Sequence, residues 1–173
     1  MVSPFFWLPK SAWSPLFWAS AGLALVLMVV LGRLSTDLGK NSILAFELAG
    51  SLTQSRSIVD GWREGQRLLA AFGLGLDYLF ILSYVAAIGL GCLLTAQAWA
   101  SLAPMGNCLA WAQVLAGVLD GIENWALLRV LLGSIAPGFP VLARQVALVK
   151  FVLVALGLLY GLVGSGLRLR RGI

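Results

Sequence analysis

Histidine is absent from this chain of 173 residues, and cysteine occurs only at Cys92 and Cys108. Without imidazole the protein cannot ligate haem or zinc in the usual ways, and it has no histidine general base. The two cysteines are too far apart in sequence for a C-x-x-C redox motif. We therefore expect both to be small apolar core residues, with a disulfide between them as the alternative.

Charged residues are also scarce. They make up 11% of the chain, whereas 60% of its residues are hydrophobic. Soluble domains contain about 25% charged and about 45–50% apolar residues, and a globule of this length has too much surface to hide such an excess. The composition therefore predicts an integral membrane protein whose main partner is the lipid bilayer. The net charge is +5, but there is no basic stripe with interleaved aromatic residues, so we expect no nucleic-acid partner.

The hydrophobic residues are concentrated in four long stretches, each with the roughly 20 residues that a membrane span needs. These stretches cover residues 13–32, 68–99, 108–132 and 139–167. The segments "SLAPMGN" and "GSIAPGFP" separate the last three. Because proline and glycine end helices and shape short turns, these spans should be antiparallel neighbours. We predict a single membrane domain over residues 1–173, an all-α bundle of four transmembrane helices.

The orientation of this bundle can be predicted from its basic residues. No small-x-small cleavage site follows the first stretch, so we interpret it as a retained helix and not as a signal peptide. The segment "RLRRGI" near the C terminus favours a cytoplasmic C terminus, and four spans then place the N terminus on the same side. We expect a cytoplasmic (inner) membrane with both termini cytoplasmic, although residues 33–67 also hold basic side chains that favour the reverse.

Residues 33–67 are more polar than the spans. Asn41 or Ser42 could cap a helix, and a leucine-rich face then runs beside a polar one. This pattern predicts an amphipathic helix over residues 42–66, between spans one and two, at the membrane surface or against the bundle. Glu47 and Ser51 lie on the stripe next to the apolar face, so both should point towards the bundle.

Ionisable residues inside the spans mark the candidate site. With a rise of 1.5 Å per residue, they fall in one layer about 13–18 Å below the membrane face that carries residues 33–67. Helical spacing places Asn124 on the face of Asp120 and Glu123, and Tyr84 on the face of Asp77. The candidate ligand-binding or ion-binding residues are Glu47, Asp77, Tyr84, Asp120, Glu123, Asn124 and Lys150.

Two interpretations of this layer stay open. An unpaired buried charge is costly, so we expect Lys150 to pair with Asp120, while Glu123 and Asp77 approach each other. Such a cluster could simply hold helices in register. It could equally mark a pathway or binding site, as intramembrane ionisable residues often do. The pattern Gly157-x-x-x-Gly161 on the last span indicates close helix packing or a face for another chain.

Three functions remain compatible with these features. The first is binding or transport of a cation, protons or an amphiphilic small molecule, by a homodimer or with a partner membrane subunit. The second is an accessory subunit of a larger membrane complex. The third is a membrane enzyme acting on a lipid or isoprenoid, with one carboxyl as general acid or with a divalent cation on all four carboxylates. The four carboxylates that would ligate the cation are those of Glu47, Asp77, Asp120 and Glu123. The sequence contains no complete catalytic signature.

Overall fold

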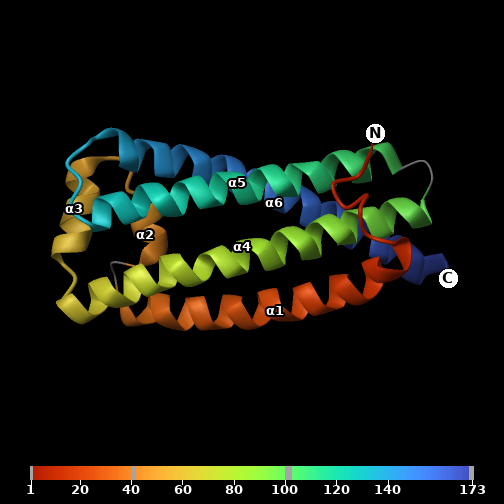
Figure 1. Ribbon diagram of the computed structural model, residues 1–173, viewed down its shortest axis with the longest axis horizontal. Coiled ribbons are helices and arrows are strands. Elements are labelled where there is room, and N and C mark those ends of the chain that lie inside the picture. Colours follow the sequence, from red (N-terminus) through yellow and green to blue (C-terminus); the bar gives the residue numbers. More distant parts are fainter. Residues whose placement is uncertain (1, 40–41, 100–102, 172–173) are drawn as a thin grey trace. The chain divides into compact units, whose positions relative to one another are not determined.

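The computed structural model describes residues 2–39, 42–99 and 103–171 (Figure 1). Over these ranges the chain is helical and has no strand, which confirms the all-α prediction. The helices are α1 (Lys10–Asp37), α2 (Ile43–Glu47), α3 (Leu52–Asp60), α4 (Glu64–Ala98), α5 (Ala103–Leu131) and α6 (Gly138–Arg171). Long apolar runs account for the four long helices, although α1 contains Pro15 and α5 begins within the segment "SLAPMGN" that was predicted to be a turn.

Three of the helices are long and apolar enough to cross a membrane, as judged by length and composition over the described residues. They are α1, α4 and residues 138–164 of α6. These helices are compatible with a membrane protein. Helix α5 has 29 residues but is not among them, because charged and other polar side chains interrupt its apolar run. Those side chains are Gln113, Asp120, Glu123, Asn124 and Arg129.

The chain forms two compact units, and each is built from separate chain segments. Unit 1 comprises Met1–Ala24, Leu82–Gly117 and Lys150–Ile173. Unit 2 comprises Leu25–Ile81 and Val118–Val149. Each unit has its own buried apolar cluster, centred on Trp13, Leu90 and Tyr160 in unit 1 and on Phe46, Trp62 and Leu127 in unit 2.

Close packing in unit 1 depends on glycines. A Cβ at Gly106 would lie 2.6 Å from the Cβ of Ala96 and 2.7 Å from the Tyr160 hydroxyl. A Cβ at Gly157 would collide with the amide of Gln113, and it would lie 2.7 Å from Ile88 Cγ2. Gly157 therefore packs within this chain, as small residues at membrane-helix contacts do, and is not left as a face for another chain.

The short helices α2 and α3 belong to unit 2, where they lie near the first turns of α4 (Figure 1). Phe46 of α2 is 1% exposed, and its ring meets that of Trp62 edge-to-face with 5.4 Å between centroids. Val59 of α3 is buried in the same cluster, together with Leu127 of α5. These apolar contacts fasten the segment between α1 and α4 to the longer helices.

The single amphipathic helix predicted over residues 42–66 is corrected to α2 and α3. Gly50 between them has φ +67°, a left-handed conformation that interrupts a right-handed helix. Ser51 does not point into the bundle as predicted; its hydroxyl caps α3 by accepting a hydrogen bond from Gln54 N at 3.3 Å. The predicted leucine face is also wrong in part, because Leu44 and Leu48 are exposed.

Candidate functional site

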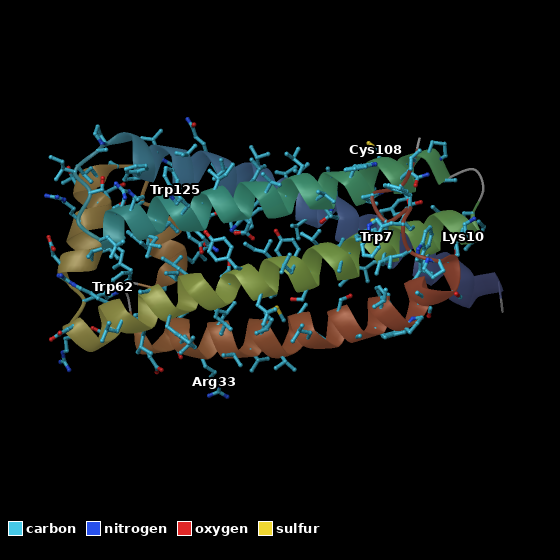
Figure 2. All side chains as sticks on the ribbon, in the orientation of Figure 1. Trp7, Lys10, Arg33, Trp62, Cys108 and Trp125 are labelled. Atoms are coloured by element: carbon cyan, nitrogen blue, oxygen red, sulfur yellow. The ribbon has the colours of Figure 1, made fainter. Side chains whose placement is uncertain are left out.

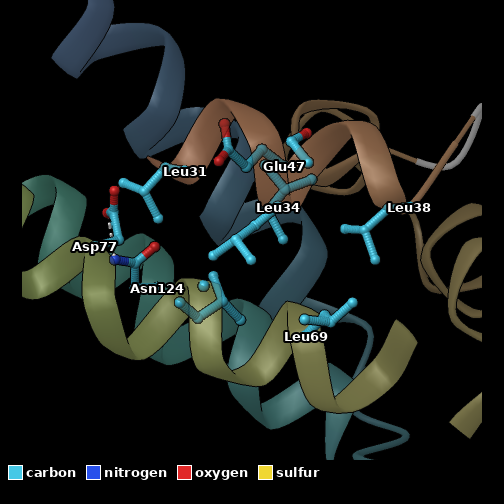
Figure 3. A pocket seen from close by; sticks show the side chains of 11 residues that line it. Leu31, Leu34, Leu38, Glu47, Leu69, Asp77 and Asn124 are labelled. Atoms are coloured by element: carbon cyan, nitrogen blue, oxygen red, sulfur yellow. Dashed lines mark hydrogen bonds between the residues drawn. The ribbon is translucent and has the colours of Figure 1, made fainter. Parts of the chain in front are cut away.

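A pocket with about 60 Å³ of space lies within unit 2 (Figure 3). A single water needs about 10–15 Å³, so this space holds several waters or a small ligand. Its walls are mostly apolar, and its polar lining consists of Ser35, Glu47, Asp77 and Asn124. The apolar lining consists of Leu31, Leu34, Leu38, Ile43, Leu69, Gly73 and Leu74.

Helix α4 brings Asp77 into this pocket. Leu69, Gly73 and Asp77 are spaced four residues apart, so they share one face of the helix. Gly73 has no side chain, which leaves space beside the carboxyl group of Asp77. Oδ2 of Asp77 accepts a hydrogen bond from Nδ2 of Asn124 at 2.7 Å, which joins α4 to α5 (Figure 3). Asp77 is half-buried and Asn124 is 2% exposed, so this polar contact is largely shielded from its surroundings.

Glu47 is the last residue of α2 and lines another wall of the pocket (Figure 3). The hydroxyl of Ser42 caps this helix by accepting a hydrogen bond from Ala45 N at 3.3 Å. The buried ring of Phe46 anchors the helix in the core of unit 2. Glu47 is half-buried as a result, and two carboxyl groups from separate helices line one leucine-walled space.

Asp120 and Glu123 of α5 are buried in unit 2, with 4% and 0% exposure. Asn124 is the residue that α5 contributes to the pocket wall, four residues after Asp120. The hydroxyl of Tyr78 donates a hydrogen bond to the carbonyl of Gly121 at 3.2 Å. That hydroxyl also lies within electrostatic reach of Asp77 and Asp120. Tyr78, which the sequence analysis did not choose as a site residue, therefore links α4 to the backbone of α5 near both aspartates.

Tyr84 and Lys150 belong to unit 1, and each is 7% exposed. The ammonium of Lys150 lies 5.2 Å from the ring centroid of its neighbour Phe151. Depth along the helices had placed Lys150 in the layer of the carboxylates, and helical spacing had placed Tyr84 on the face of Asp77. The pairing of Lys150 with Asp120 stays a prediction.

The predicted metal set is not assembled in the described part of the chain. Over these residues, no group of three or more His, Cys, Asp or Glu side chains could hold a metal ion. Glu47, Asp77, Asp120 and Glu123 come from three different helices, and only Glu47 and Asp77 line the pocket. The site therefore has the character of an acidic pocket and not of an all-oxygen metal cage.

The sequence analysis did not predict one wall of the pocket. Ser35 and three leucines of the segment 31–38 line it, but the first span was predicted to end at residue 32. Their spacing of three, four and seven residues was a usable signal, since it puts them on one helix face.

The pocket thus combines carboxyl, amide and hydroxyl groups with leucine walls. Small-molecule sites are typically built in this way, with a few polar groups that orient a ligand against apolar surfaces. In comparisons with known proteins, no protein-family model, no curated protein and no solved structure matches this chain.

Proposed function

We propose that this protein has four membrane spans, and that α5 is a span in addition to α1, α4 and α6. Between residues 111 and 125 the exposed large apolar side chains of α5 recur at spacings of three and four residues, which is the pattern of a lipid-facing helix surface. Its buried polar residues lie on the other faces, so they need not meet lipid. The exposed residues are Trp111, Leu115, Val118, Ile122 and Trp125.

In this arrangement α2 and α3 form a segment at one membrane interface, between the first two spans. An even number of spans places both termini on one side, which we assign to the cytoplasm of an inner membrane by the positive-inside rule.

We further propose that the pocket in unit 2 binds a small positively charged molecule, either a simple cation or an amphiphile with a cationic head. The observation that carries this proposal is the presence of Glu47 and Asp77 on two walls of one leucine-lined pocket. Charges attract more strongly where the dielectric constant is low, as it is among apolar walls. The leucines would contact an alkyl group of the ligand, and the carboxylates would contact its cationic head.

Thermal unfolding of the purified protein in mild detergent tests this proposal. The probe is n-butylammonium, with n-butanol as an uncharged molecule of similar shape. A ligand present at about 100 times its Kd adds about 2.7 kcal/mol to the stability of the folded state. We expect n-butylammonium to raise the Tm, and n-butanol at the same concentration to leave it unchanged.

Three variants assign the effect to the pocket. Glu47→Gln and Asp77→Asn should each abolish most of the stabilisation by n-butylammonium. Glu64→Gln is the matched control, because Glu64 is exposed in the first turn of α4 and does not line the pocket. Equal stabilisation by sodium ions would assign the pocket to simple cations. A Tm that no cation moves, or equal responses from all three variants, would contradict the proposal.

A further inference from the structure

An open groove of about 400 Å³ lies within unit 1, on the part of the molecule that the proposed cation pocket does not use. Its walls come from Phe5, Trp7 and Leu8 in the N-terminal segment, from residues 16–23 of α1, and from Ala86 and Leu90 of α4. This volume falls in the range of about 300–1,000 Å³ that ligand pockets occupy.

The N-terminal wall of the groove is held in place by specific contacts. Nε1 of Trp111 donates a hydrogen bond to the carbonyl of Val2 at 2.9 Å. The ring of Phe5 packs against Gly89, where a Cβ would lie 2.9 Å from Cε2 of that ring. Leu8 packs against the buried cluster of unit 1. The groove is therefore preformed by the fold and does not depend on a ligand to create its walls.

The lining of the groove suits an aliphatic chain. Ser20 is the polar residue of the lining, and its hydroxyl donates hydrogen bonds to its own helix, to Leu16 O at 2.7 Å and Phe17 O at 3.1 Å. The other lining side chains are apolar. A ligand with polar groups along its length would lose hydrogen bonds on entering, whereas a hydrocarbon chain would lose none.

The surroundings of the groove are aromatic and basic. Trp7 and Trp18 are 68% and 70% exposed, as tryptophans of an interfacial belt are. Lys10, the exposed first residue of α1, lies at the same end of the unit as Trp7 (Figure 2). The sequence of unit 1 contains no acidic residue, and its basic residues are Lys10, Lys150, Arg168, Arg170 and Arg171. The net charge of +5 of the whole chain therefore resides in this unit, since unit 2 has as many acidic as basic residues.

We propose that this groove is a binding site for an anionic phospholipid, with one acyl chain between the N-terminal segment, α1 and α4, and the phosphate at Lys10. Apolar walls alone would not select a particular lipid, because they bind every acyl chain alike and bulk lipid is equally apolar. The exposed ammonium of Lys10, in a unit whose sequence has no acidic residue, favours an anionic headgroup, as basic residues beside a membrane do.

Native mass spectrometry of the detergent-extracted protein tests this site. The protein is loaded with phosphatidylglycerol or with phosphatidylcholine that carries the same acyl chains. We expect one phosphatidylglycerol to stay bound under conditions that remove phosphatidylcholine. Lys10→Gln should weaken phosphatidylglycerol retention by about fivefold, the effect of one basic residue at an anionic surface. Arg33→Gln is the matched control, because Arg33 is also exposed on α1 but belongs to unit 2 (Figure 2).

A second pair of variants tests the acyl-chain part of the site. Ala19→Phe fills the groove and should lower the retention of phosphatidylglycerol, whereas Val29→Phe adds the same ring to an exposed position of α1 in unit 2 and should not. Equal retention of both lipids by the wild type would overturn the proposal, as would equal effects of Lys10→Gln and Arg33→Gln. A lipid-free dimer as the stable species would assign the groove to a second copy of the chain instead.

Discussion

Asn124 of α5 donates a 2.7 Å hydrogen bond from its Nδ2 to Oδ2 of Asp77 of α4, and both residues line the same pocket. Asn124 is almost fully buried, so a water molecule cannot easily replace it as the partner of Asp77. The bond therefore holds two walls of the pocket together and also fixes the direction of a carboxyl group within it.

This relationship predicts coupling between the two residues. Asn124→Ala and Asp77→Ala should each lower the free energy of unfolding, and the double variant should be less destabilised than the sum of the two. Hydrogen bonds between membrane helices contribute about 0.6–2 kcal/mol, which sets the expected coupling energy. Unfolding of all four proteins in the same detergent gives the value. Additivity within about 0.3–0.5 kcal/mol would mean that the bond does not stabilise the protein.

Gly157 and Gly161 should respond differently to alanine. A Cβ at Gly157 would collide with the fully buried amide of Gln113, whose Nε2 donates to Leu153 O at 2.9 Å and so cannot move freely. Gly157→Ala should therefore destabilise the protein by about 1–3 kcal/mol, as overpacking does. A Cβ at Gly161 meets nothing within 4 Å. Gly161→Ala should be neutral or stabilising by up to about 1 kcal/mol, because alanine is the better helix former.

Thermal unfolding of the Gly157→Ala and Gly161→Ala variants measures this difference in stability. Similar losses of stability for both would show that the two glycines form one packing face, as the sequence pattern had suggested, and would contradict the contact between Gly157 and Gln113.

Gly50 should be sensitive to substitution because of its backbone and not because of crowding. Its φ of +67° is left-handed, which costs an alanine about 1–2 kcal/mol. Its nearest neighbour is the flexible end of the Arg144 side chain, 2.7 Å from a Cβ at this position, and that end can move away. We expect Gly50→Ala to destabilise the link between α2 and α3, and Gly50→Asn to cost less, since asparagine tolerates this conformation.

Limited proteolysis of the region between α1 and α4 measures this effect. Arg144→Ala in the Gly50→Ala background serves as the control and should restore little. A full rescue by Arg144→Ala would show that crowding is the cause and would refute the backbone explanation.

The two cysteines should differ in reactivity. Both are free thiols; Cys92 is 1% exposed and its Sγ donates to Gly157 O at 3.7 Å, whereas Cys108 is exposed. In single-cysteine variants, Cys108 should react rapidly with a small methanethiosulfonate reagent, and Cys92 should react only as the core opens. Denatured protein, in which both thiols are accessible, gives the reference rates. Comparable rates in the folded protein would contradict the burial of Cys92.

The amino-acid sequence by itself determined the helical class and the approximate limits of the long helices. The reason is physical. Lipid offers no hydrogen-bond partner to the backbone N–H and C=O groups of a long apolar run, and a helix pairs these groups within the run itself. Residues 68–99, for example, correspond to α4, Glu64–Ala98. Local spacing also predicted that Asp120, Glu123 and Asn124 share one face, and these residues are buried in the structure.

Only the tertiary structure decided which faces meet. Periodicity places a residue on a helix face but does not say which helix that face packs against. It therefore could not show that Gly157 packs against Gln113, or that the segment around Ser35 forms a pocket wall with Glu47 and Asp77. The break at Gly50 was hidden for a related reason: glycine is compatible with a continuous helix and with a left-handed turn. Its conformation is settled by contacts far away in the sequence, such as those that hold Phe46 and Val59 in the core of unit 2.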